Sequence, residues 1–276
     1  LLVFLLALGM YALNKVMGRK SKPVVIFLML HFVQLTGLII ALEVDWPPYV
    51  LEIYDQLSTM ILSVNSLHPE CFAEEWTYYQ SMGLKVLGPW VLALAFFSIS
   101  LILTWMARTC FRSTNPETLL KNITYKSRAT TARYISLLIL VFTYQYQMET
   151  LLRSLPCDGD HLKGNSTTQC PAMVTKVFLA AVIFGIGILF PFLLLWRMRK
   201  LAKTLIYDQD LYETSAVMMI GQSYRPQIPF FEVILMWYKL SMLVVVVFFD
   251  NMLLQASTAL AFCAIYVFIL IELKPY

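Results

Sequence analysis

Seven stretches of about 20 mostly apolar residues constrain the fold of this chain more than any other feature. They lie at about residues 1–17, 24–43, 84–107, 134–155, 174–197, 231–249 and 252–273. A helix of this length crosses the hydrocarbon core of a bilayer, where the backbone finds no water and must satisfy its own hydrogen bonds. Charged residues make up only 14% of the chain, too few to cover a soluble globule of this size. The sequence therefore predicts an all-α polytopic transmembrane bundle, with residues 1–276 as a single domain.

Both ends of the chain are abrupt. Leu1 opens directly into apolar sequence without a preceding basic region, which argues against a signal peptide, and the chain stops at Tyr276 just after the last apolar stretch. We therefore expect the chain to be a piece of a longer protein, with seven spans as a minimum.

The distribution of lysine and arginine predicts the orientation of the spans, because positive charge is retained on the cytoplasmic side. Of the 21 basic residues, 15 fall in the connections after the first, third and fifth stretches and at the carboxyl end: Arg19, Lys20, Lys22, Arg108, Arg112, Lys121, Lys126, Arg128, Arg133, Arg197, Arg199, Lys200, Lys203, Arg225 and Lys274. The opposite connections are acidic. We therefore expect the amino-terminal side to be extracellular and the carboxyl-terminal side cytoplasmic. The net charge of +4 reflects this topology and gives little support to nucleic acid as a partner.

A glycosylation sequon, Asn165-Ser166-Thr167, falls in the predicted outer loop 156–172. A second sequon begins at Asn122, on the predicted cytoplasmic side, where it would stay unmodified. The sequence therefore predicts a sugar on Asn165, and a sugar on Asn122 would contradict the orientation.

Three of the five cysteines fall on the predicted outer side, which is an oxidising environment. Cys157 and Cys170 bracket a short, turn-rich loop, and a disulfide between them would restrain it with little strain. Cys71 would then have no partner within the chain, so we expect either a link to an extracellular part of the protein or a free thiol. A metal site is the weaker interpretation, because no histidine spacing supports it.

The longest outer connection, residues 45–81, has its own apolar periodicity. Val50, Tyr54, Leu57 and Ile61 recur at helical spacing, with polar residues opposite. The pattern predicts an amphipathic helix on the outer surface of the membrane or of the bundle. A half-helix that dips inward to line a pore is the alternative.

Lys239 lies near the middle of the sixth apolar stretch, and a charge at that depth normally faces the bundle interior with a partner. At a rise of about 1.5 Å per residue, polar residues of the second and fourth stretches reach a similar depth. The other members of the expected polar layer are His31, Gln34, Gln145, Glu149 and Glu232. The two glutamates are candidate partners of the lysine. The layer is either an interhelical bond or an ion or proton pathway.

Gly185, Gly187 and Pro191 lie in the fifth stretch and allow either a close approach of another helix or a bend, so they are the candidate hinge. The sixth and seventh stretches are joined by little more than Asp250 and Asn251, which leaves no room for a pore helix between them. A phosphate loop, an HExxH motif and a nucleophile elbow are all missing from the sequence. We therefore expect no enzymatic activity, no metal and no cofactor.

Several short patterns in order resemble the transient-receptor-potential-like (TRP-like) membrane domain at the carboxyl end of large extracellular proteins of algae, oomycetes and ciliates. They are Trp46 and Pro47; Pro69, Glu70 and Cys71; Cys157, Gly159, Leu162 and Cys170; Tyr224, Arg225 and Pro226; Phe231, Glu232 and Lys239; and Lys274, Pro275 and Tyr276. Two features depart from this pattern. The sixth stretch has one basic residue where a pair is common, and the run from Gly185 to Pro191 replaces Tyr-Pro-x-Gly-x-Pro.

The resemblance implies the membrane domain of a large cell-surface protein, which passes cations or senses force on its extracellular part. A non-conducting membrane anchor or adhesion receptor is the alternative. The expected partners are membrane lipids and a large extracellular domain or assembly on the amino-terminal side, and self-association into a homo-oligomer stays open. The expected location is the plasma membrane, with a ciliary or other surface membrane as a variant.

Overall fold

The computed structural model describes residues 31, 34–42, 46–52, 78–109, 116–163, 165–204, 215–221 and 228–274. Five helices in this part of the chain are long and apolar enough to cross a bilayer: Tyr78–Thr109, Ile123–Arg153, Met173–Lys203, Phe231–Phe248 and Met252–Leu273. They coincide with the last five predicted stretches. The first stretch, 1–17, lies outside the described residues. Of the second, the structure describes residues 31 and 34–42, with helix over 34–40.

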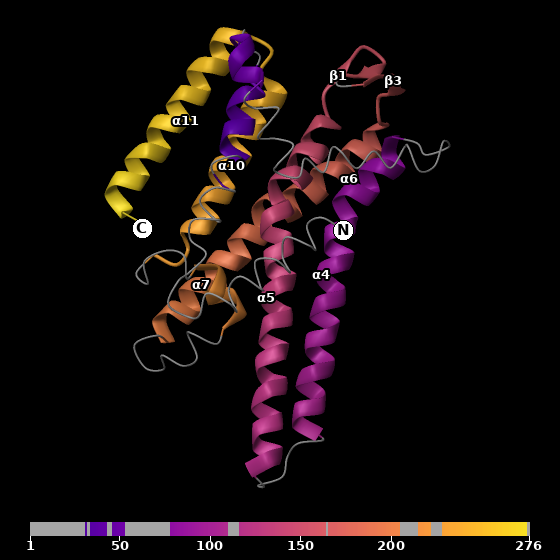
Figure 1. Ribbon diagram of the computed structural model, residues 1–276. Helices are drawn as coiled ribbons and strands as arrows, with labels where there is room; N and C mark the ends of the chain where they lie inside the picture. Colours follow the sequence, from indigo (N-terminus) through magenta and orange to yellow (C-terminus); the bar gives the residue numbers. More distant parts are fainter. Residues whose placement is uncertain are drawn as a thin grey trace.

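The helices α4 (Tyr78–Thr109) and α5 (Pro116–Arg153) form a long antiparallel pair (Figure 1). The continuous helical segment α6 (Met173–Ile183), η3 (Phe184–Leu189) and α7 (Phe190–Thr204) crosses beside α5. The short helix α9 (Ala216–Gly221) packs on α5 and α7, and the hairpin of α10 (Phe231–Phe248) and α11 (Met252–Leu273) completes the bundle.

Two helices begin well before the apolar stretch that predicted them. The fourth stretch was expected from residue 134, but α5 begins at Pro116, a favoured residue for the first turn of a helix. The third was expected from residue 84, but α4 begins at Tyr78, inside the predicted outer connection 45–81. Of that connection, helix over 48–52 is also described, and residues 53–77, with most of the expected amphipathic face, lie outside the described residues.

Helix α5 is the centre of the bundle. In its most apolar 18-residue window 67% of the residues are buried, against 17% in α4 and 11% in α11. Large apolar side chains on α4 and α11 remain exposed, as lipid-facing residues are in a membrane bundle. The core around α5 takes side chains from α5, α6, α7, α10 and residues 34–42, including Leu38, Tyr144, Met148, Leu179, Met198, Val233 and Met236.

Small residues at a seven-residue spacing let α4 and α5 approach closely. Val86, Ala93, Ser100 and Ala107 are the buried residues of α4 from position 86 onward, and this period keeps one seam facing the partner helix. The Ser136 hydroxyl donates to the Ala93 carbonyl oxygen at 2.8 Å across this seam. The seam explains why α4 stays attached to α5 although most of its own surface is exposed.

The described part of the chain is mostly helical, as predicted, and a small three-stranded antiparallel sheet is added to the helices. Its strands β1 (Cys157–Asp158), β2 (His161–Leu162) and β3 (Asn165–Gln169) lie within the predicted outer loop 156–172. Gly159 has a φ of 60° in the two-residue turn between β1 and β2, a conformation in which glycine has no steric cost. The loop is therefore an ordered cap between α5 and α6.

Contacts of this sheet show which helix ends share one end of the bundle. Tyr79, at the start of α4, donates its hydroxyl to the Gln169 carbonyl oxygen at 3.1 Å. The Lys163 ammonium pairs with Asp250, between α10 and α11. The start of α4, the end of α5, the start of α6 and the α10–α11 turn therefore lie at the same end, as the alternation of successive spans requires.

Candidate functional site

A cluster of buried polar and charged side chains joins the second apolar stretch to α10. His31, Glu232 and Lys239 expose 4%, 1% and 2% of their surface. The His31 ring lies between the other two, with Nε2 at 3.1 Å from Glu232 Oε2 and Nδ1 at 3.1 Å from Lys239 Nζ. Glu232 and Lys239 are seven residues apart on one helix, so His31 bridges about two turns of α10.

The chemistry of the lysine determines the direction of these hydrogen bonds. An ammonium group has only donors, so His31 Nδ1 accepts from Lys239. A neutral imidazole then carries its proton on Nε2 and donates it to the Glu232 carboxylate. In this arrangement an ionised Lys239 and an ionised Glu232 lie on opposite sides of the ring and offset each other's charge. This balance is what makes two ionised side chains tolerable at that depth.

Gln34 extends the cluster to α5. Its Oε1 atom accepts from Lys239 Nζ at 2.5 Å, and its Nε2 atom lies 3.4 Å from the Phe142 carbonyl oxygen. Gln145 donates to the backbone carbonyl oxygen of Gln34 at 3.3 Å. The Phe142 ring also stacks against the His31 ring, with centroids 6.4 Å apart. The cluster therefore ties His31 and Gln34 to both α5 and α10. We call it the charged junction, and its members are His31, Gln34, Gln145, Glu232 and Lys239.

The structure places Glu149, the sixth residue of the expected polar layer, away from the charged junction. Glu149 pairs with Arg153, one turn further along α5, at 3.0 Å. Its place near the end of the helix explains this contact, because Arg153 is closer to it than a side chain at mid-depth. The lysine meets His31 and Gln34 instead, and Glu232 is linked to it through the histidine.

A π-helical segment, η3, occupies the predicted hinge of the fifth stretch. It includes both Gly185 and Gly187, and Pro191 follows in the first turn of α7. In a regular α-helix the N–H at position 191 would donate to the Gly187 carbonyl oxygen, but proline has no N–H. The Tyr144 hydroxyl of α5 donates to that oxygen at 2.9 Å, so the carbonyl that proline leaves without its usual donor is satisfied from the neighbouring helix.

Gly187 also permits the close packing of α5 against η3. A Cβ atom at this position would lie 2.9 Å from Cε of Met148, whereas one at Gly185 would meet nothing within 4 Å. The two glycines therefore differ: Gly187 is the point of helix approach, and Gly185 is not.

Several polar contacts between spans escape prediction from the sequence. Gln147 is buried in α5 and accepts from the Trp90 ring nitrogen of α4 at 2.9 Å. Arg133 donates to Ser100 at 2.7 Å and to Thr104 at 3.0 Å. Single polar residues in apolar helices signal such bonds without naming the partner. The bond from Tyr144 to the Gly187 carbonyl oxygen is the exception. The four-residue spacing of Gly187 and Pro191 marks this oxygen as an acceptor that lacks its usual N–H donor.

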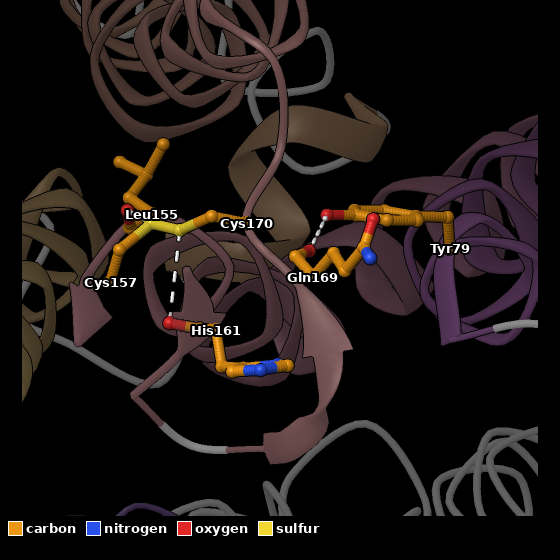
Figure 2. The surroundings of a disulfide bond; sticks show 6 residues. All are labelled: Tyr79, Leu155, Cys157, His161, Gln169 and Cys170. Carbon is orange, nitrogen blue, oxygen red and sulfur yellow. Dashed lines mark hydrogen bonds between the residues drawn. A yellow bond between two sulfur atoms is a disulfide. The ribbon is translucent and has the colours of Figure 1, made fainter. Parts of the chain in front are cut away.

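The predicted disulfide between Cys157 and Cys170 is present and closes the three-stranded sheet (Figure 2). The figure also shows Tyr79 reaching the Gln169 carbonyl oxygen beside it. Asn165 is the first residue of β3, and Cys71 lies outside the described residues. Within the described part of the chain, no three His, Cys, Asp or Glu side chains are grouped as metal ligands.

Comparison with protein families, with curated proteins and with solved structures finds no match to this chain. The charged junction and the π segment are therefore interpreted from their own chemistry.

Proposed function

We propose that the chain is the membrane domain of a TRP-like, cation-conducting protein of the cell surface, and that the charged junction holds its second and sixth spans together in the closed state. The observation that carries this proposal is the bridging of Glu232 and Lys239 by His31. Ionisable groups within a membrane are costly, and proteins retain them mainly on ion pathways, on proton relays and at moving interfaces.

The π segment supports the same proposal. Segments of this kind occur frequently at functional sites, because one extra residue per turn loosens the regular hydrogen-bond pattern. In this chain the segment packs on the same two turns of α5 that contact Gln34: Tyr144 and Met148 face η3, while Phe142 and Gln145 contact Gln34. Movement of η3 and loss of the junction would therefore both act on the same stretch of α5.

A non-conducting anchor is the second candidate. It is favoured because the members of the charged junction bond to one another. Lys239 donates to two acceptors of the same segment, and His31 connects both ionised groups. Such a cluster also serves as a simple bond between helices. The anchor would join an extracellular assembly on the amino-terminal side to the membrane.

The deciding experiment is current recording from the full-length protein in planar bilayers. We compare the wild type with Lys239→Met, which removes the charge and keeps the length of the side chain. The control is Ser241→Ala, on the same helix, where the lost hydroxyl bonds the backbone carbonyl oxygen of Trp237 in its own helix. A cation-selective current that changes in opening or selectivity in Lys239→Met, but not in Ser241→Ala, supports the proposal. Folded wild-type protein that carries no current contradicts it and favours the anchor.

A further inference from the structure

We propose that Arg133 binds the phosphate of an anionic phospholipid at the end of the α4–α5 pair that lies far from the sheet (Figure 1). The distribution of lysine and arginine predicts that this end is cytoplasmic, the side on which membranes carry most of their anionic lipid. The feature that carries the proposal is a guanidinium group held between two helices by uncharged side chains. It does not depend on the charged junction or on conduction.

The side chain of Arg133 runs from α5 toward the end of the pair. Its Nε atom donates to Ser100 Oγ at 2.7 Å, and its Nη2 atom donates to Thr104 Oγ1 at 3.0 Å, one turn nearer to the end of α4. The Cα–Cβ bond of a helical residue also tilts toward the amino terminus of its helix, which for α5 is Pro116, at this same end. Arginine extends in this way when it carries its charge from an apolar span toward the lipid headgroups.

The charge of Arg133 has no carboxylate beside it in the described part of the chain. Both of its acceptors are neutral hydroxyl oxygens, and none of the described ion pairs includes it. Glu117 is the only acidic residue between positions 97 and 136, and it precedes Arg133 by 16 residues, about 24 Å along a helix. Three of the five guanidinium N–H donors have no partner among the described residues. A half-buried, permanent cation therefore presents donors to an anion from outside the chain.

Two further cations lie at the level where a headgroup would be bound. Lys126 precedes Arg133 by seven residues, which is two turns, so it is on the same face of α5. Arg108 follows Thr104 by one turn on α4, and both Arg108 and Lys126 are exposed. A planar guanidinium pairs with two phosphate oxygens at once, and the two outer cations add attraction for the same negative group.

The surface of α4 next to this group of cations is apolar, which favours a lipid over a soluble anion. Leu101 and Ile102 follow Ser100 and expose 50% and 56% of their surface, and Trp105 exposes 64%. Tryptophan is enriched at the level of the headgroups, and exposed leucine and isoleucine offer contacts to acyl chains. The phosphate would therefore lie at Arg133, with the chains along α4.

The test is native mass spectrometry of the full-length protein, released from detergent micelles that contain phosphatidylglycerol or phosphatidylcholine. Phosphatidylglycerol is anionic, whereas the choline group of the second lipid offsets its phosphate. For Arg133→Gln we expect the dissociation constant of the first bound phosphatidylglycerol to rise by about tenfold, the effect of losing hydrogen bonds between charged groups. Binding of phosphatidylcholine stays the same. A role of Arg133 only in joining α4 to α5 would lower stability and leave the dissociation constant unchanged.

Two variants of exposed residues show whether the position of the charge matters. Arg128→Gln is the matched control, because it removes the same charge from α5 about 140° round the helix from Arg133, and it changes the dissociation constant by less than about twofold. Lys126→Gln, on the face of Arg133, raises it by about fivefold and keeps the test decisive if Arg133→Gln does not fold.

Three results would overturn the proposal. They are equal affinity of the wild type for the two lipids, an equal loss in Arg128→Gln and Lys126→Gln, and displacement of phosphatidylglycerol by soluble glycerol 3-phosphate at a similar concentration. The last would indicate a site for a soluble anion. None of these results depends on current, so failure of the lipid site is distinct from failure of the proposed function.

Discussion

At the scale of single residues, the charged junction depends on the balance between Lys239 and Glu232. Each is buried, and each reaches the other through His31. Removal of one charge leaves the opposite charge without compensation in a site that excludes solvent. Removal of both leaves a polar but uncharged contact, so the effects of the two substitutions are not additive.

We therefore expect Lys239→Met and Glu232→Gln each to lower the free energy of unfolding by about 3–5 kcal/mol, the range for one broken partner of a buried pair. The double variant loses less than the sum. Thermal or denaturant unfolding of the reconstituted protein measures the free energy of unfolding of the wild type, the two single variants and the double variant. Additive losses would show that the two charges do not interact.

Gly187 allows a second test at this scale, because another glycine of the same π segment is its control. Gly187→Ala places a Cβ 2.9 Å from Met148 Cε, the end of a flexible side chain, so we expect a loss of about 1 kcal/mol, the lower end of the range for overpacking. Gly185→Ala meets no atom within 4 Å and changes stability by less than about 1 kcal/mol. Comparison of the two melting temperatures decides the point. Equal losses would contradict the proposed role of Gly187 as the approach site.

Sequence alone predicted the depth of the polar side chains but not all of their partners. His31, Gln34 and Lys239 were placed in one layer by helical rise, and the structure brings them into contact. Glu149 was placed there too, but a residue one turn away on its own helix is always within reach, and it pairs with Arg153. The rise per residue along a helix gives the depth of a side chain in the membrane. It does not give the direction in which the side chain points around the helix axis, so it cannot identify the partner.

At the scale of elements, the cap between α5 and α6 is a sheet closed by one disulfide. The cysteines lie 13 residues apart, and the bond holds β1 next to the end of β3. By the chain-entropy estimate for a loop of this size, the bond stabilises the fold by about 2–4 kcal/mol.

We expect Cys157→Ser, Cys170→Ser and the double variant to lower the melting temperature by the same amount, because all three remove the same bond. A reducing agent should lower that of the wild type similarly and leave the double variant unaffected. Different melting temperatures of the two single variants would indicate that one of the thiols has a separate role.

The elements that were predicted incorrectly are those that no pattern of apolar residues marks. Hydropathy locates the apolar part of α5, but the helix extends back to Pro116 through a mostly polar segment that hydropathy does not register. The short strands of the cap are set by the Gly159 turn and the disulfide, and two-residue strands have no periodicity to detect.

At the scale of the whole molecule, two contacts of the cap align the ends of five helices. The pairs Tyr79–Gln169 and Lys163–Asp250 place the α10–α11 turn and the start of α4 beside the sheet. Successive spans had to alternate, and this much followed from the order of apolar stretches. Which helix lies at the centre did not follow, because α5 and α4 are both apolar, and only packing shows that α5 is enclosed.

The charge distribution predicts that the cap lies on the extracellular side, and glycosylation tests that prediction. We expect the full-length protein from eukaryotic cells to lose mass on glycosidase treatment, and Asn165→Gln to abolish the part of the shift that this site contributes. Asn122→Gln is the matched control and leaves the shift unchanged. A sugar on Asn122 would invert the topology.

The hydrogen bonding of His31 is the basis of the whole interpretation, and nitrogen NMR of protein with ¹⁵N-labelled histidine reports it directly. The chain has three histidines, so the His31→Gln variant assigns the signal by its loss. Near neutral pH we expect a neutral His31 ring with its proton on Nε2 and a bare, hydrogen-bonded Nδ1 whose resonance shifts in Lys239→Met. A proton on Nδ1, or a resonance indifferent to Lys239, would contradict the charged junction.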